Sequence, residues 1–261
     1  MKIFLSALEQ QATAYAKKGK AVVDLLLEQG IKMKWNLMSY YYIRNKEEMA
    51  CKIRDNSEEV LIDSGAHSIQ FGAKVDFEKY TRQYAEFITR FDRDNVIGYF
   101  EMDIENIIGY EKVLYLRSIL EAVSDKIIPV WHPLRGINDY EKMCQKYAGK
   151  IIAIGGFRGT DIKDDQFLMF VKVARKYGCK VHCLGMTRKE VLNRVPFDFT
   201  DSASWAFSTV HGKIGHGDFS RGKVTMEYYK AHQDVCWVEN YKAGIKTQEL
   251  YHRMWRKECK D

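Results

Sequence analysis

Carboxylate side chains stand at the ends of apolar segments of this sequence. Asp63 follows one such segment, Glu101 and Asp103 follow the next, and Asp201 lies in the last. Burying a carboxylate without a partner costs several kcal/mol, yet no Lys or Arg lies in the segments that carry Asp63, Asp103 or Asp201. Carboxylates that meet in one pocket can bind a divalent metal, act as nucleophile and acid/base at a sugar carbon, or accept hydrogen bonds from a purine.

The histidines and cysteines do not have the spacing of a metal site. His132 ends one apolar segment and His182 lies inside another, but no His-x-His pair occurs. The six cysteines include no Cys-x-x-Cys pair, and Cys179 and Cys183 have no second ligand pair of zinc-site spacing. We therefore expect reduced thiols, no zinc and no metal cofactor.

Eight short apolar segments predict the strands that carry the candidate residues. They are near-continuous apolar runs, as in a parallel sheet covered by helices, at 2–8, 34–42, 59–65, 96–103, 126–133, 150–156, 180–186 and 197–205. Stretches of helical period lie between them, at 7–30, 76–91, 110–123, 138–149 and 166–178. Sequences typical of capping boxes predict that helices open at 138–141 and 187–190.

This alternation predicts an α/β fold, a single (β/α)8 TIM barrel with a C-terminal helical extension and no zinc subdomain. One domain would cover residues 1–261, with the barrel at 1–222 and helices at 223–261. An open doubly wound sheet is the alternative, but it would be expected to carry a Gly-rich turn after its first strand, where the sequence reads SALEQQ.

Composition and charge narrow the classes of protein. Apolar residues form 46% of the 261 residues, and no apolar run reaches the roughly 20 residues that span a bilayer. The N-terminus becomes charged too early for a secretory signal, so we expect a cytoplasmic protein without a membrane partner. The net charge of +6 allows a polyanionic partner without requiring one.

The basic segment at 246–260 contains two aromatic residues, Tyr251 and Trp255, and is expected to be helical. Two interpretations of this segment stay open. The helix could lie along a phosphate backbone, or its aromatic rings could dock on the core while its charges face solvent.

In a barrel, the chemistry belongs at the carboxyl ends of the strands. Reading these ends in order places Asp63 with Ser64, Glu101 with Asp103, and Asp201 with Ser202 at the same mouth. We expect Ser64 and Ser202 to support the acids beside them.

Six motifs in order resemble the tRNA-guanine transglycosylase (queuine tRNA-ribosyltransferase) superfamily. They are LIDSGAHS, YFEMD, IPVWHP, IAIGGF, VHCLGM and FDFTDSASW, and they extend from Leu61 to Trp205. The short chain without a zinc segment is most similar to the phage and bacterial relatives that place deazapurines in DNA. Such a protein would work in the cytoplasm, or in the host cytoplasm if a phage encodes it.

The resemblance implies a double displacement through a covalent aspartyl–sugar intermediate. Asp201 matches the nucleophile, and Asp63 matches the acid/base on the departing and incoming bases. Asp103 matches the residue that accepts hydrogen bonds from guanine N1–H and N2–H₂, and Asp198 matches an acid that we assign to supporting Asp201.

The remaining implied contacts surround the base. They are His132 where the family has Gln, Gly155 and Gly156 where missing side chains admit the base, Phe157 after them, His67 stacking on one face and Leu184 closing the other. The sequence departs from the family at Ala66, Ser68 and His132, and residues 220–241 replace the zinc segment with a single cysteine.

The resemblance favours an enzyme that exchanges guanine in DNA for a 7-deazaguanine such as preQ0. Three alternatives stay open: the same exchange on tRNA, hydrolysis that leaves an abasic site, and a non-catalytic nucleic-acid-binding partner subunit. The joint presence of Asp63, Asp103 and Asp201 argues against a silent subunit. Because the tRNA enzymes pair, a homodimer is also an expectation.

Overall fold

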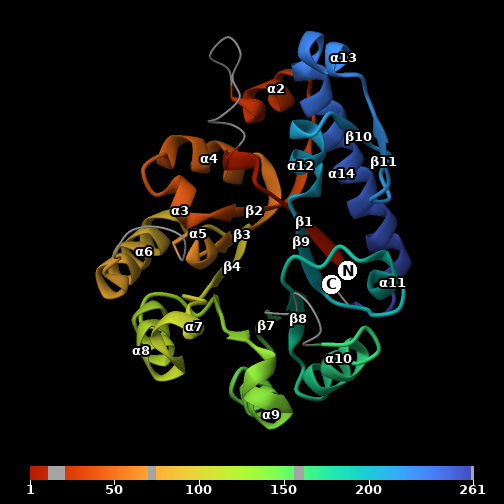
Figure 1. The fold of residues 1–261 in the computed structure, drawn as a ribbon. Helices are drawn as coiled ribbons and strands as arrows, with labels where there is room; N and C mark the ends of the chain where they lie inside the picture. The colour runs from red at the N-terminus through yellow and green to blue at the C-terminus, as the bar shows by residue number, and fades with distance from the viewer. Residues whose placement is uncertain (11–20, 70–74, 156–161, 260–261) are drawn as a thin grey trace.

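Eight strand positions form a closed parallel barrel wrapped by helices (Figure 1). The computed structural model describes residues 1–10, 21–69, 75–155 and 162–259. The barrel strands are β1 (Lys2–Ser6), β2 (Met33–Ser39), β3 (Ser57–Asp63), β4 (Val96–Phe100), β5 (Ile127–Ile128), β6 (Val130–Trp131), β7 (Ile151–Ile154), β8 (Lys180–Cys183) and β9 (Phe199–Ser202). Each strand lies within two residues of a predicted segment, so the predicted α/β barrel is confirmed.

The barrel closes through one strand that a proline divides. The sheet order is β5-β4-β3-β2-β1-β9-β8-β7-β6, with every neighbouring pair parallel, and only Pro129 separates β5 from β6. Proline has no N–H to donate, but its carbonyl still accepts a hydrogen bond from Ala153 N at 2.9 Å. The first half of this strand pairs with β4 and the second half with β7, which joins the two ends of the sheet.

The helices follow the strands in turn around the barrel. They are α2 (Val22–Glu28), α3 (Tyr40–Ile43), α4 (Glu47–Asp55), α5 (Ala66–Ile69), α6 (Phe77–Phe91), α7 (Glu105–Ile108), α8 (Tyr110–Glu121), η1 (Pro133–Arg135), α9 (Gly136–Lys146), α10 (Phe167–Lys176), α11 (Lys189–Leu192), α12 (Ser204–Val210), α13 (Met226–Ala231) and α14 (Gln233–Trp255). A hairpin of β10 (Lys213–Gly215) and β11 (Arg221–Lys223) lies between α12 and α13.

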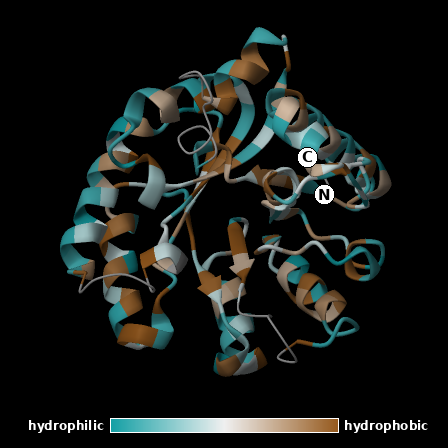
Figure 2. Cartoon of the chain, turned by 45° about the horizontal axis from the view of Figure 1, so that its top comes forward, coloured by the Kyte–Doolittle hydropathy of each residue, from teal (hydrophilic) through white to brown (hydrophobic). Residues whose placement is uncertain are grey.

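Three clusters of buried residues result, one inside the barrel and two between the barrel and its helices. Alternating strand residues such as Phe4, Leu61 and Phe100 fill the interior, and their neighbours pack outward against apolar helix faces. Figure 2 shows this division, with hydrophobic colour on the central strands and hydrophilic colour on the outer helix surfaces. No helix among the described residues is long and apolar enough to cross a membrane.

The two predicted capping boxes are wrong. Helix α9 begins at Gly136, so Asn138 lies within its first turn, and α11 begins at Lys189 after Arg188 without a side-chain cap. Gly136 has a φ of +74°, which lets the chain turn from η1 directly into α9 two residues before the expected start.

The C-terminal helices form part of the barrel wall. In α14, the Nε2 of Gln248 donates to the carbonyls of Ile3 and Trp35, each at 2.8 Å. Tyr251 is only 2% exposed, and Trp255 Nε1 donates to the Leu192 carbonyl at 2.8 Å. The aromatic rings of Tyr251 and Trp255 therefore dock on the protein, as the second interpretation of this segment expected.

A buried ion pair ties α8 to the closing strand. Arg117 donates to both oxygens of Glu101, from Nε at 2.6 Å and from Nη2 at 3.0 Å, and both side chains are almost fully buried. Glu101 Oε1 also accepts from Val130 N at 2.5 Å. One carboxylate thus joins β4, β6 and α8.

Arg117→Met is expected to lower the free energy of unfolding by about 3–5 kcal/mol, because it leaves Glu101 buried without a counter-charge. Urea unfolding at neutral pH measures the loss. Arg82→Met, which breaks the exposed pair with Glu78 on α6, serves as the control and is expected to change little. Equal effects of the two substitutions would contradict a special role for the buried pair.

Candidate active site at the carboxyl end of the barrel

The alternation of side chains along each strand aims the predicted site residues into the barrel mouth. Asp63 lies two residues beyond the interior residue Leu61, and Asp201 lies two beyond Phe199. The same spacing puts His132, Gly155 and Leu184 above interior positions of β6, β7 and β8, while Asp103 follows the end of β4. Because all strands are parallel, these positions share one end of the barrel.

Two donors hold one oxygen of Asp201. His182 Nε2 lies 3.0 Å from Oδ1, and the backbone N–H of Gly185 donates to the same oxygen at 2.7 Å. Gly185 has a φ of +63°, a left-handed conformation that turns its N–H toward the carboxylate. Within the described chain Oδ2 of Asp201 accepts no hydrogen bond, so this oxygen is available for chemistry.

The contact with Asp201 is the one hydrogen bond that the His182 ring makes with the described residues. The residue is completely buried between the rings of Phe4, Phe100 and Phe199. Its Nδ1 makes no hydrogen bond with the described residues. A neutral imidazole carries one N–H, and the arrangement is satisfied when that hydrogen is on Nε2 and points at Asp201.

Asp63 combines burial with nearby negative charge. Its Oδ2 accepts from Gly65 N at 2.8 Å and from Ser39 Oγ at 3.2 Å. Burial raises the pKa of Asp63 to about 6, and the negative charges of Asp201 and Asp103 raise it as well, against the two hydrogen bonds. A carboxyl with this pKa can both give and take a proton near neutral pH.

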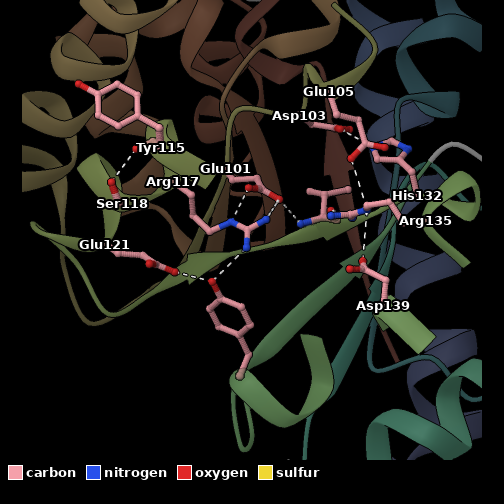
Figure 3. A network of polar contacts seen from close by, with 12 residues as sticks. Glu101, Asp103, Glu105, Tyr115, Arg117, Ser118, Glu121, His132, Arg135 and Asp139 are labelled. Atoms are coloured by element: carbon pink, nitrogen blue, oxygen red, sulfur yellow. Dashed lines mark hydrogen bonds and ion pairs between the residues drawn. The ribbon is translucent and has the colours of Figure 1, made fainter. Parts of the chain in front are cut away.

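Asp103 faces an imidazole. Figure 3 shows Asp103 and His132 pointing toward one another, with Glu105 and Arg135 beside them. Burial works against a charged ring, but the hydrogen bond to Asp103 and the charges of Asp103 and Glu105 outweigh it, so the pKa of His132 is raised. Contact of His132 with a base stays a prediction, since its Nε2 is occupied by Asp103.

Glu101, only two residues before Asp103, points elsewhere. Its carboxylate turns to Arg117 and away from Asp103, as Figure 3 also shows. The four strand-end carboxylates therefore divide into one structural acid, Glu101, and three acids that share the mouth.

The missing side chain of Gly155 makes room for His132. A Cβ on Gly155 would lie 3.1 Å from His132 Cε1 and 3.0 Å from Val130 Cγ1. Leu184 is half-buried against the interior core at the end of β8. Both residues lie at the mouth, and their contacts with a base stay predictions.

Asp198 does not support Asp201, contrary to our expectation. It precedes β9 at the opposite end of the barrel, where Oδ2 accepts from Val181 N at 2.8 Å. Burial raises its pKa, and the nearby charges of Arg175 and the N-terminus lower it. Three residues along a strand span roughly 10 Å, and His182 and Gly185 take the supporting role instead.

The two supporting serines differ from one another. Ser202 Oγ accepts from Ser204 N at 3.1 Å, which secures the turn that leads from β9 into α12. Ser64 is fully buried, and its hydroxyl has no hydrogen-bond partner among the described residues. Direct support of Asp63 comes from Ser39 rather than from Ser64.

Three predicted base contacts cannot be placed. Gly156 and Phe157 lie outside the described residues, and only the backbone of His67, in α5, is described. Our predictions for these positions stay as they were.

The sequence analysis places Ser39 at a strand end and His182 inside a strand, but it assigns no role to either of them or to Glu9. His182 has the same strand parity as Leu184, and Ser39 has the same parity as the interior residue Leu37, so both could have been found by counting along the strands. Glu9 follows β1 and is only 1% exposed, with Oε1 accepting from Ser39 N at 3.0 Å. Nothing in its sequence neighbourhood marks it as buried.

Among the described residues, no group of three His, Cys, Asp or Glu side chains is arranged to hold a metal ion. No protein-family model and no curated protein matches this chain. The fold and the mouth therefore define a (β/α)8 barrel protein with a cluster of three carboxylates, and the chemistry must be argued from these groups.

Asp63→Asn is expected to abolish a pH-dependent loss of stability. A carboxyl whose pKa is raised by folding favours the native state below its unfolded pKa and loses that contribution as pH rises through about 6. Relative to the wild type, the variant should gain on the order of 2–3 kcal/mol between pH 4 and pH 7. Urea unfolding at each pH measures this, with exposed Asp94→Asn as control, and parallel curves for wild type and Asp63→Asn would contradict it.

Gly155→Ala is expected to push the His132 ring away from Asp103. Without that hydrogen bond the remaining effect of burial lowers the pKa of His132. The NMR titration of the ring measures the shift, with exposed His211 as an internal reference. An unchanged midpoint for His132 would show that the ring tolerates the added methyl group.

Proposed function

We propose that this protein exchanges guanine in DNA for a 7-deazaguanine base through a covalent aspartyl–sugar intermediate. The observation that carries the proposal is the division of labour among the three acids of the mouth. Asp201 keeps one oxygen available, Asp63 has a pKa of about 6, and Asp103 is oriented by an imidazole. A glycosyl transfer with retention needs this combination of nucleophile and proton carrier.

The reaction would proceed in two matched displacements. Oδ2 of Asp201 attacks the anomeric carbon of the target guanosine, the bond to guanine breaks, and the departing base takes a proton from Asp63. The incoming base then loses a proton to ionised Asp63 and attacks the same carbon, which releases Asp201. Protons and electron pairs balance over the cycle, and the energy of the glycosidic bond is conserved in the intermediate.

Asp103 would read the base. Guanine presents N1–H and N2–H₂ as donors on its Watson–Crick edge, and an ionised carboxylate accepts both. The ring of His132, which contacts Asp103, would keep that carboxylate oriented. Both the leaving and the incoming base carry these donors, so one acid can serve both half-reactions.

DNA is favoured over tRNA by the region that follows the nucleophile. Where the resembled tRNA enzymes carry a zinc segment, this chain has the β10–β11 hairpin and α13. The net charge of +6 is compatible with a nucleic-acid partner. We place the reaction in the cytoplasm, and exchange on tRNA is the second substrate to test.

Asp201→Asn is expected to reduce base exchange by about 10³-fold or more, because an amide cannot form the covalent link. Duplex DNA, single-stranded DNA and tRNA are each incubated with labelled guanine or preQ0, and label retained in the polymer is counted. Asp198→Asn is the matched control and should retain exchange, since Asp198 lies at the other end of β9.

The outcomes separate the alternatives. Label in DNA that disappears in Asp201→Asn supports the proposal, and label in tRNA alone redirects it to that substrate. Abasic sites without label indicate hydrolysis. Binding without label, abasic sites or a covalent adduct on a denaturing gel would identify a non-catalytic partner subunit.

A further inference from the structure

The buried carboxyl of Glu9 lies near the mouth, and the reaction proposed above gives it no part. It lies just beyond the end of β1, in the helical turn at residues 8–10, and is 1% exposed. Its position next to β2 and β3 is therefore fixed by packing. A buried carboxyl is costly for the fold, so its contacts must offset that cost.

Ser39 connects Glu9 to the acid/base candidate Asp63. Its backbone N–H donates to Glu9 Oε1 at 3.0 Å, and its hydroxyl donates to Asp63 Oδ2 at 3.2 Å. The end of β2 is thus held between two carboxyl groups, one from the turn after β1 and one from the end of β3.

The backbone beside Asp63 permits only a glycine at position 65. Gly65, which donates to Asp63 Oδ2 at 2.8 Å, has a φ of +81°, and a Cβ there would lie 2.4 Å from the Cβ of Tyr41 and 3.1 Å from Ser39 Oγ. Only glycine fits, so the N–H of residue 65 and the hydroxyl of Ser39 converge on one oxygen.

Among the described residues, two charged side chains act on Glu9. Asp63 on β3 raises the pKa of Glu9, Lys46 at the start of α4 lowers it, and the hydrogen bond from Ser39 lowers it too. Burial has the largest effect and raises the pKa of Glu9 to about 7. The charges of Asp201 and Asp103 act on Asp63 from the other side.

We propose that Glu9 is the positioning residue of Asp63: its carboxyl oxygen holds the Ser39 N–H, and the Ser39 hydroxyl is thereby aimed at Asp63. A hydrogen bond to the ionised form of a carboxyl favours that form, so the positioned hydroxyl limits how far burial raises the pKa of Asp63. In the reaction proposed above, on which this inference rests, Asp63 can therefore take a proton from the incoming base as well as give one to the leaving guanine.

Substitutions at position 9 test the positioning role. Glu9→Leu removes the acceptor for Ser39 N–H, so the Ser39 hydroxyl is no longer aimed at ionised Asp63 and the titration midpoint of Asp63 should rise, as it should in Ser39→Ala. Glu9→Gln keeps that acceptor and should leave the midpoint close to the wild-type value. A residue that merely filled space at position 9 would leave the midpoint unchanged in Glu9→Leu.

The test follows Asp63 by NMR of carboxyl-labelled aspartate in the full chain, with the resonance assigned from Asp63→Asn. Glu59→Gln is the matched control, since Glu59 lies on the same strand at the far end of the barrel, paired with Lys2 at 2.7 Å. A higher midpoint in Glu9→Leu, with no change in Glu9→Gln or Glu59→Gln, supports the proposal. An unchanged or lower midpoint in Glu9→Leu overturns it, and if that variant does not fold, Glu9→Met is measured in its place by the same criterion.

Base exchange gives a second readout. Because the leaving base needs protonated Asp63, the wild-type rate should fall as the pH rises past the midpoint, and Glu9→Leu should move that fall to higher pH. If the wild type exchanges no base, the proposed function fails, while the NMR titration still decides the role of Glu9. If exchange occurs and its pH profile is the same in Glu9→Leu, the inference fails and the proposed function stands.

Discussion

Closure of the barrel at Val130 is the constraint on which the rest of the structure depends. Val130 donates its N–H to Glu101, and its carbonyl accepts from the guanidinium of Arg135. Glu101 is in turn held by Arg117, so this residue of the divided strand is bound to β4, to α8 and to the loop that precedes α9. An open sheet of the same strands would separate the acids on β3 and β9 from the imidazole beyond β6. The closed ring brings them to one mouth.

Closure also brings three carboxylates together at the mouth. Like charges at one end of a barrel repel one another, and each of these carboxylates has different neighbours. Asp201 is held by a buried imidazole and a backbone N–H, and Asp103 by a second imidazole. Asp63 has no imidazole partner among the described residues, and burial raises its pKa to about 6. Differences between neighbours separate the protonation behaviour of chemically identical groups, which is how a site obtains both a nucleophile and an acid from aspartates.

The candidate acids could be predicted because the local sequence shows both the apolar strands and the acids at the ends of those strands. The apolar runs define the strands, and Asp63 and Asp201 occupy the carboxyl end of two of them. What local sequence could not separate was Glu101 from Asp103, two residues apart: only the approach of Arg117 from α8 makes one of them structural. Asp198 was misassigned for a related reason. The motif puts it near Asp201 in sequence, but an extended strand carries it to the other end of the barrel.

The residues that hold the acids were missed because they come from other strands. His182 reads as one polar residue in an apolar run, and its meaning depends on β8 lying beside β9. Glu9 reads as a surface acid of an amphipathic helix, and only the packing of the chain after β1 against β2 and β3 buries it.

By itself the sequence determined the number and order of the strands, the parallel class of the sheet and the acids at the strand ends, because hydrophobic period and strand parity are local properties of the chain. The tertiary structure alone decided which acid is neutralised, which is oriented by an imidazole and which has a raised pKa. Those outcomes depend on contacts between residues remote in the chain, such as Glu9 with Ser39 and His182 with Asp201, and on burial, which exists only once the barrel has closed.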